Sequence, residues 1–184
     1  MMHHSAVYLV SVLWLIFLVY WAIAAGRSGK KDVYLGGPWR RWASVIIVLL
    51  LLGQLPYLNR PMVPRTTVVD GVAILFVAAG LAFAFWARRH LGANWSTQPA
   101  VRQAHELVTS GPYGLARHPI YTGILLALLG SALTDGVLWF MVFLTAAAAF
   151  VSRAKAEEQL MTQRFPDKYP AYRRRTKAFV PFVL

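Results

Sequence analysis

Residues 6–25 read AVYLVSVLWLIFLVYWAIAA, a run without a single charged side chain. A helix rises about 1.5 Å per residue, so a run of this length crosses the roughly 30 Å of hydrocarbon in a bilayer. Residues 22–24 also resemble the small-residue cleavage site of a secretory signal peptide. The order of charges opposes that alternative, because no Lys or Arg precedes the run and basic residues begin at Arg27. We therefore expect a retained membrane-spanning helix.

Four further apolar blocks follow along the chain. Residues 43–58 and 68–87 are each expected to form a span. Two shorter blocks, 120–133 and 137–151, are separated only by residues 134–136. The simplest arrangement for them is a tight helical hairpin whose helices continue into polar sequence. The sequence thus predicts an all-α polytopic membrane protein with about five transmembrane helices, the last two forming the hairpin.

The composition agrees with this class. The 184 residues are 58% hydrophobic and 14% charged, whereas soluble domains are about 45–50% apolar and about 25% charged. A net charge of +12 would suggest nucleic acid for a soluble chain, but here the cations flank apolar blocks, so we predict contact with a lipid bilayer and none with nucleic acid. We expect one integral membrane domain, with three helices in residues 1–87 and a polar connection, the hairpin and a tail in residues 88–184.

Metal and thiol chemistry find little support. The chain has no cysteine, which excludes disulfides, thiolate metal sites and a cysteine nucleophile. The five histidines lack the spacing of a metal site, so we predict no bound metal.

Basic residues are divided unevenly between the two sides of the predicted topology. Residues 26–42, 88–118 and 152–184 hold 17 of the 19 Lys and Arg residues, and the opposite side holds only Arg60 and Arg65. The positive-inside rule places the 17 in the cytosol. This predicts an N-terminus outside, a C-terminus inside and any polar site facing the cytosol.

Two polar clusters interrupt the apolar pattern before the predicted hairpin. Residues 105–113 read HELVTSGPY, which on local grounds is a loop with a Gly-Pro turn. Residues 117–123 read RHPIYTG. Pro119 disfavours the α conformation at His118 and suits the first turn of the next helix. From the residues alone, a Pro-started helix with interfacial aromatic side chains and a functional motif remain equally acceptable.

A third cluster, residues 153–158, reads RAKAEE and continues directly from the last apolar block. We expect that helix to end near Pro166. Arg153 and Glu157 are four residues apart and therefore share one helix face. An ordinary exposed ion pair is the plain alternative, but charged groups near the bilayer boundary are costly without partners, which favours a functional site.

In their order and spacing these clusters resemble the isoprenylcysteine carboxyl methyltransferase family and, more loosely, the phospholipid N-methyltransferases. The resemblance covers roughly residues 90–184. It rests on HELVTSGPY at 105–113, RHPIYTG at 117–123, Arg153 with Glu157-Glu158, FPDKYPAY at 165–172, and the ending Pro181-Phe182.

The resemblance implies an S-adenosyl-L-methionine cofactor, released as S-adenosyl-L-homocysteine, in a pocket at the cytosolic face. Carried over by motif, the cofactor contacts fall on Gln98, His105, Glu106, Leu107, Val108, Tyr113, His118, Pro119, Ile120, Tyr121 and Glu157. Arg153 corresponds to the family arginine implicated in holding the substrate carboxylate. Arg153 and Glu157 are accordingly the predicted catalytic residues.

The expected reaction is methyl transfer to a lipophilic acceptor, and a carboxylate such as that of prenylcysteine is favoured. A carboxylate or thiolate is already nucleophilic, so the protein need only align the reactants and exclude water. A protonated amine would need a base, for which Glu157, Glu158 or His118 are available. A lipid amine or small-thiol methyltransferase is the nearest alternative, and a small membrane transporter or scaffold protein is the alternative from another class. The acceptor, any recognition of a prenyl group, the source membrane and the oligomeric state stay open.

Overall fold

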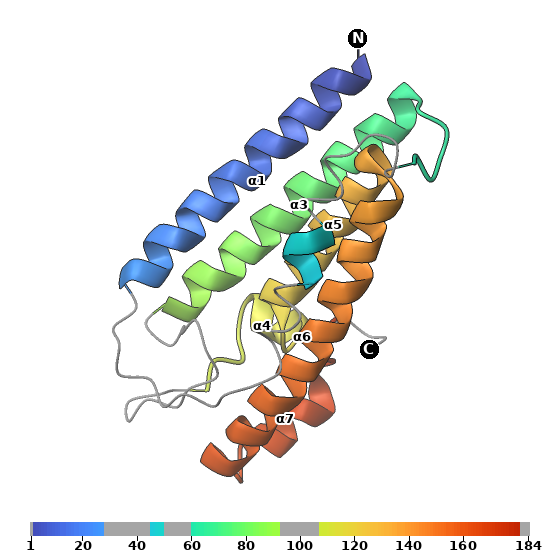
Figure 1. Ribbon diagram of the computed structural model, residues 1–184. Helices are drawn as coiled ribbons and strands as arrows, with labels where there is room; N and C mark the ends of the chain where they lie inside the picture. Colours follow the sequence, from blue (N-terminus) through green and yellow to red (C-terminus); the bar gives the residue numbers. More distant parts are fainter. Residues whose placement is uncertain (1, 28–44, 50–59, 93–106, 181–184) are drawn as a thin grey trace.

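The computed structural model describes residues 2–27, 45–49, 60–92 and 107–180, and every named element in these ranges is a helix (Figure 1). The all-α prediction is therefore confirmed for the described part of the chain. The elements are α1 (Met2–Arg27), α3 (Thr67–Leu91), α4 (Pro112–Leu115), α5 (Pro119–Asp135), α6 (Val137–Arg164) and α7 (Tyr169–Arg175).

Three of these helices, α1, α3 and α6, are long and apolar enough to cross a membrane. The fourth apolar helix, α5, has 17 residues and is shorter than a full crossing needs. Most of the predicted span 43–58 lies outside the described residues, although residues 45–49 are helical. The count of five spans stays a prediction.

The two apolar blocks flanking residues 134–136 form helices that nearly touch end to end. Helix α5 ends at Asp135, helix α6 begins at Val137, and Gly136 alone lies between them. Its φ of 104° is in the left-handed region, which glycine adopts at little steric cost. The two helices then pack side by side, with Leu128 of α5 and Val142 of α6 in one buried cluster. As predicted, α6 continues past its apolar block, to Arg164.

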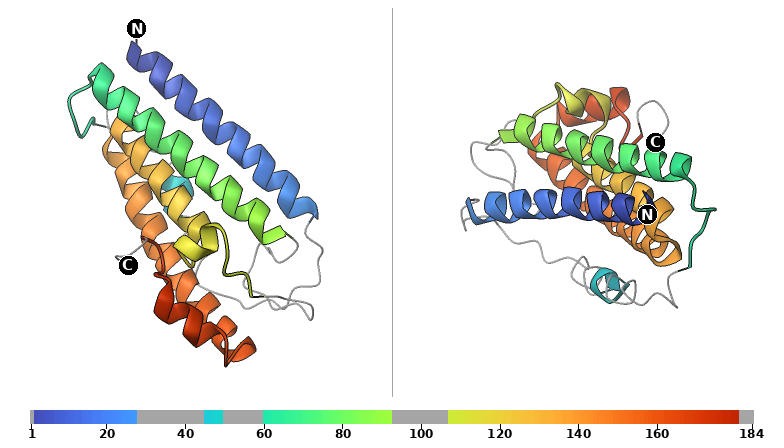
Figure 2. Two further views of the ribbon diagram at one scale, coloured as in Figure 1. Left: turned by 180° about the vertical axis from the view of Figure 1, so that it is seen from behind. Right: turned by 90° about the horizontal axis from the view of Figure 1, so that it is seen from above.

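Helices α3 and α5 lie side by side along their length (Figure 2). Glycines at their contact allow this close approach. A Cβ built at Gly80 would lie 2.7 Å from the backbone N of Ala127 and closer still to the carbonyl O of Gly123. A Cβ at Gly130 would likewise meet the carbonyl O of Ala73 at 2.7 Å. Helices in membranes often associate through such glycine contacts, because lipid provides no hydrophobic drive to bring them together.

Helix α1 lies against α3 and α5 through aromatic side chains. Phe17 is buried in the core cluster and stacks on Trp21 with ring centroids 4.4 Å apart. The indole Nε1 of Trp14 donates a hydrogen bond of 2.9 Å to Ser131 Oγ in α5. This bond joins two residues that are 117 positions apart in the sequence, one in α1 and one in α5.

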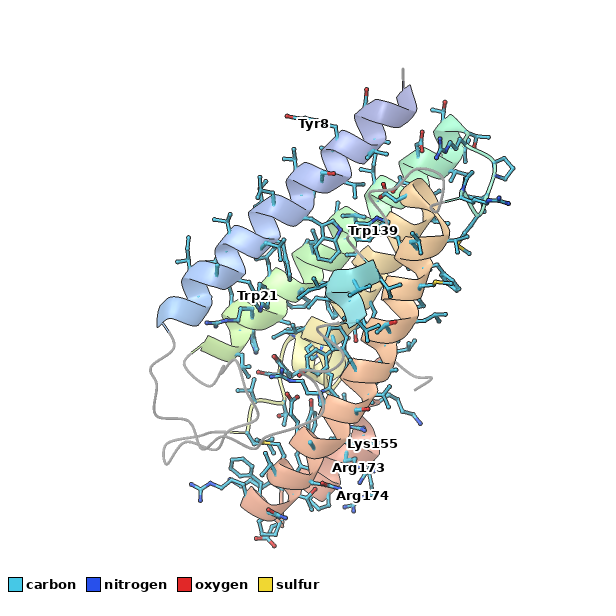
Figure 3. All side chains as sticks on the ribbon, viewed as in Figure 1. Tyr8, Trp21, Trp139, Lys155, Arg173 and Arg174 are labelled. Carbon is cyan, nitrogen blue, oxygen red and sulfur yellow. The ribbon has the colours of Figure 1, made fainter. Side chains whose placement is uncertain are left out.

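The two ends of the helical bundle differ in charge. Figure 3 shows Lys155, Arg173 and Arg174 together at the end that carries α7. Arg60 belongs to the opposite end, where its carbonyl accepts a hydrogen bond of 2.9 Å from the N–H of Val137, the first residue of α6. The separation agrees with the uneven division of basic residues in the sequence, while the side of the membrane that each end faces stays a prediction.

Candidate active site

Charged and aromatic side chains converge where the start of α5 meets the polar half of α6. We call this group the charge cluster. Its members are Arg117, His118 and Tyr121 at the start of α5, and Arg153, Glu157 and Glu158 on α6.

Local structure explains how these residues meet. Pro119 occupies the first turn of α5 and leaves His118 as the residue before the helix, with φ −123° and ψ 58°. This is the helix start that the Pro119 motif predicted. On α6, Glu157 and Glu158 are adjacent, and both side chains reach the 117–121 segment.

Glu157 joins three other members of the cluster. Its Oε1 accepts hydrogen bonds from the Tyr121 hydroxyl at 2.6 Å and from Arg153 Nε at 3.0 Å. Its Oε2 lies 3.5 Å from Nδ1 of His118. The pairing of Arg153 with Glu157 confirms that the two share a helix face, and the contacts to α5 show that it is more than an isolated surface pair.

Glu158 contacts three basic side chains from two segments of the chain. Its Oε1 lies 2.8 Å from both Nε and Nη2 of Arg117 and 3.2 Å from Nε2 of His118. Its Oε2 lies 3.5 Å from Nε of Arg173 in α7. The Glu158 side chain is only 13% exposed, so these partners offset the cost of burying its charge.

His118 is held between the two carboxylates. Each ring nitrogen faces one of them, Nδ1 towards Glu157 and Nε2 towards Glu158. Ionised carboxylates only accept hydrogen bonds, so this placement favours the imidazolium form, in which both ring nitrogens carry hydrogen. Burial alone would lower the pKa of His118, but the hydrogen bonds and negative charges of Glu157 and Glu158 outweigh it and raise the pKa above its ordinary value.

Aromatic rings form the apolar side of the cluster. The Tyr121 ring stacks on Phe150 with centroids 4.5 Å apart and on His118 at 5.5 Å. Phe179, from the segment after α7, also packs against the His118 ring, with centroids 5.6 Å apart. The charged groups thus have π surfaces, which attract cations, on one side.

Tyr113 lies beside the cluster in α4. Its carbonyl accepts a hydrogen bond of 2.6 Å from the hydroxyl of Tyr172 in α7. Burial raises the pKa of the Tyr113 phenol, and the nearby charge of Glu157 adds to the effect. Tyr113 is therefore a neutral side chain next to the charge cluster.

The predicted site residues divide into three groups. Arg153, Glu157, His118 and Tyr121 are in direct contact, and Tyr113 adjoins them. The second group is described but makes no polar contact with the cluster: Leu107, Val108, Pro119 and Ile120. The third group lies outside the described residues: Gln98, His105 and Glu106.

Four members of the site were not among the predicted site residues. Arg117 and Glu158 lie in the motifs on which the resemblance rests, and Glu158 was one of the available bases, but neither was predicted as a site residue. Phe150 and Phe179 carried no signal, because aromatic residues in an apolar helix or near a chain end are common. Only the tertiary contacts identify them.

A cavity of about 710 Å³ opens next to the charge cluster, between residues 107–109 and α7. It shares no lining residue with the cluster. Tyr172 connects the two features, since it lines the cavity and hydrogen-bonds to Tyr113. The charge cluster, where the charged groups converge, is the candidate site. The cavity is lined by Leu107, Thr109, Phe165, Asp167, Lys168, Ala171, Tyr172 and Arg175.

Across residues 2–27, 45–49, 60–92 and 107–180, no group of three or more His, Cys, Asp or Glu side chains is arranged to hold a metal ion.

A model of the isoprenylcysteine carboxyl methyltransferase family matches residues 72–163, which is half of the chain. The nickel-cobalt-cadmium resistance protein NccN of Alcaligenes xylosoxydans xylosoxydans is 27% identical over 147 residues, covering 79% of this chain and 63% of the relative. The cobalt-zinc-cadmium resistance protein CzcN of Cupriavidus metallidurans is 28% identical over 163 residues, covering 85% and 70%. Protein-S-isoprenylcysteine O-methyltransferase of Mus musculus is 28% identical over 127 residues, covering 67% and 45%. The chain thus spans from under half to about 70% of the length of these relatives.

Proposed function

The chain belongs to the isoprenylcysteine carboxyl methyltransferase family, as its motifs predicted, and we propose that it transfers a methyl group from S-adenosylmethionine to a lipophilic acceptor. The acceptor we favour is a carboxylate such as that of prenylcysteine, which would become a methyl ester. The family match at residues 72–163 includes the whole charge cluster. Relatives named protein-S-isoprenylcysteine O-methyltransferase support the same reaction class.

The convergence of Arg153, His118 and Tyr121 on one partly buried carboxylate, Glu157, is the observation that carries this proposal. A charged group with three partners near the end of an apolar helix is costly to maintain. Such a group is expected where a polar ligand must be held at the membrane boundary. Helix α6 supplies both parts, an apolar half and a polar half.

The residues present fit the proposed cofactor. S-adenosylmethionine carries an adenine ring, ribose hydroxyls, an ammonium group and a sulfonium. The rings of His118, Tyr121 and Phe150 offer π surfaces for adenine or for a cation. The Glu157 carboxylate is an acceptor for ribose hydroxyls or the ammonium group. When bound, the cofactor supplies an electrophilic methyl group.

The chain's own residues would then align the acceptor and exclude water. The planar guanidinium of Arg153 can hold a carboxylate through two parallel hydrogen bonds, a geometry that lysine cannot provide. Apolar helix faces around the cluster would keep water away from the acceptor oxygen, which strengthens these interactions. Arg153 is held in place by its bond to Glu157, so its orientation is set before the acceptor arrives.

The state of His118 favours a carboxylate over an amine acceptor. An amine must lose a proton before it can attack, so the site would need a base. The raised pKa of His118 favours its protonated form, which cannot take another proton. Glu157 and Glu158 are each committed to cationic partners. A carboxylate acceptor needs no base, and a thiolate acceptor remains the alternative.

We place the cluster at the cytosolic face of the membrane, with the N-terminus outside and the C-terminus inside. Five spans, with α5 and α6 as the final hairpin, complete the proposed topology. The polar cofactor would enter from the cytosol and the lipid-tailed acceptor would slide in laterally between helices. The gathering of basic residues at the α7 end of the bundle supports this orientation (Figure 3).

The acceptor class can be tested with cofactor labelled in its methyl group. Purified protein is incubated with prenylcysteine and lipid acceptors, and the labelled product is treated with alkali. A methyl ester releases volatile methanol, whereas N-methyl and S-methyl groups stay bound. Stable label would exclude the carboxylate acceptor. If the cofactor produced neither label transfer nor a thermal shift in detergent, a transporter or scaffold function would be favoured.

The role of Arg153 is tested by Arg153→Ala. We expect turnover to be abolished while cofactor affinity is largely kept, because the guanidinium is assigned to the acceptor. Lys155→Ala is the matched control, since Lys155 is an exposed cation two residues along the same helix. An equal loss of cofactor affinity and turnover in Arg153→Ala would show that Arg153 belongs to the cofactor site instead.

A further inference from the structure

Glu158 is the most heavily partnered side chain that the proposed mechanism leaves without a role. It contacts no residue assigned to the acceptor, yet it bonds to Arg117 and His118 before α5 and to Arg173 in α7. Its neighbour Glu157 faces the same histidine from the other side. A partly buried carboxylate is costly to keep and needs partners, so a second one facing the same histidine calls for an explanation beyond helix stability.

Through Arg117, Glu158 also acts on the segment that follows α7. Arg117 Nη1 donates to the carbonyls of Thr176 and Arg173, and the backbone N–H of Arg117 donates to the carbonyl of Lys177 at 2.8 Å. The backbone N–H of His118 donates to the carbonyl of Ala178 at 2.9 Å. The segment is thereby fixed against the start of α5.

This segment also supplies Phe179, which packs against the His118 ring. Thr122 Oγ1 donates to the carbonyl of Phe179 at 2.8 Å, and the Phe179 ring lies 5.6 Å from the His118 ring. Glu158 therefore influences the position of His118 in two ways. One is the direct contact with Nε2, and the other runs through Arg117 to the backbone that places Phe179.

Charged and titratable groups face His118 from several elements. Glu157 and Glu158 approach it from α6, and Tyr121 stacks on it from α5. Three arginines bracket this set: Arg117 precedes His118 in the chain and binds Glu158, Arg173 approaches Glu158 from α7, and Arg153 binds the far side of Glu157.

We propose that Glu158 is a positioning residue for methyl transfer, which keeps His118 doubly protonated and fixed in orientation against the proposed cofactor. The inference rests on the proposed function. An imidazolium that donates to two carboxylates cannot turn without losing both bonds. A neutral ring keeps only one donor and is free to rotate or shift its tautomer.

The direction of the pH dependence follows from this. His118 has a raised pKa, so its protonated form persists above the ordinary range and is lost as pH rises through the raised value. Glu158→Gln keeps the shape and an acceptor oxygen but removes the charge. The pKa of His118 should then fall by about one pH unit, which is the usual influence of one nearby opposite charge.

The experiment uses the full chain in detergent micelles, with ¹⁵N-labelled histidine and no cofactor. NMR titration gives the pKa of His118, identified by its loss in His118→Gln. In Glu158→Gln we expect this pKa about one pH unit lower than in the unchanged protein. The increase of the cofactor KM at alkaline pH (the alkaline limb) should begin about one pH unit lower in Glu158→Gln. At pH values above both His118 pKa values, the KM of Glu158→Gln should be up to about tenfold higher than that of the wild-type protein. We expect kcat at saturating cofactor to change less than KM does, because Glu158 acts on the cofactor through His118.

Two further variants separate positioning from folding. Asp167→Asn removes one exposed carboxylate near α7. The pH at which the cofactor KM begins to rise should not change in this variant, because salt screens exposed charges. Glu158→Asp keeps the charge but shortens the side chain, so it should restore part of the His118 pKa. If Glu158→Gln does not fold, Glu158→Asp is the test. The pKa of His118 in Glu158→Asp should then lie between that of an ordinary histidine and that of His118 in the wild-type protein.

An unchanged His118 pKa in Glu158→Gln, or a loss of kcat and thermal stability with the alkaline limb unmoved, would overturn the proposal and leave Glu158 a structural residue. Failure of the proposed function gives a different pattern. In that case the unchanged protein shows no cofactor binding, while the cofactor-free titration still reports whether Glu158 sets the charge of His118.

Discussion

The tight crossing of α3 and α5 makes a sharp prediction about two glycines in the same helix. In Gly80→Ala the new Cβ would lie 2.7 Å from Ala127 N and 3.2 Å from Ala127 Cβ, and closer still to the carbonyl O of Gly123. Unstrained carbon contacts are about 3.5–4.0 Å, so the helices must separate locally by about 1 Å. In Gly71→Ala the Cβ would meet nothing within 4 Å.

Both substitutions gain the same helix propensity, about 0.5–1 kcal/mol over glycine, so their difference isolates the steric cost. Overpacking of this kind costs about 1–3 kcal/mol. We therefore expect Gly80→Ala to be less stable than Gly71→Ala by that amount, or about 5- to 150-fold in the unfolding equilibrium. Gly71→Ala should match or exceed the unchanged protein.

The assay is reversible unfolding of the full chain in mixed micelles, followed by circular dichroism. Cofactor affinity is measured alongside, because α5 carries His118 and Tyr121 at its start. A Gly80→Ala protein that unfolds at the same midpoint as Gly71→Ala would refute the close approach of α3 and α5. The position of the α5 start would then have no explanation in the packing of these two helices.

Two hydrogen bonds between distant helices give the remaining predictions. Trp14→Phe removes the donor to Ser131, and a double-mutant cycle with Ser131→Ala should give a coupling of about 0.6 kcal/mol in unfolding free energy, typical of bonds between membrane helices; a coupling of zero would contradict the contact. Tyr172→Phe leaves the buried Tyr113 carbonyl without its 2.6 Å partner and should cost about 1–3 kcal/mol in the same unfolding assay. Unchanged stability of Tyr172→Phe would show that α7 does not hold α4 in place.

Periodicity and local stereochemistry predicted most helix positions correctly. The apolar runs gave α1, α3, α5 and α6, because long uncharged segments must satisfy their backbone hydrogen bonds internally in lipid. Pro119 gave the start of α5, because its ring fixes a helical φ and restrains the residue before it. The observed helices extend beyond the apolar runs, since a helix continues into polar sequence until a residue such as Pro166 stops it.

The sequence was less informative about which polar groups meet. The spacing of Arg153 and Glu157 fixed their shared face, because that distance is local to one helix. Nothing local indicated that Glu158 would bind Arg117, 41 positions away, or that Phe179 would lie against His118. Such contacts depend on how α5, α6 and the segment after α7 pack together.

By itself, therefore, the sequence determined the membrane-compatible helices, their approximate ends, the uneven distribution of charge and the motifs of the family. These properties follow from hydrophobicity, backbone stereochemistry and residue spacing, all of which act over a few residues. Only the tertiary structure decided that the two carboxylates of α6 contact His118 from opposite sides. It also decided that Phe179, in the chain after α7, packs against the His118 ring. That arrangement depends on the close approach of α3 to α5 and of α5 to α6, a property of packing between segments far apart in the chain.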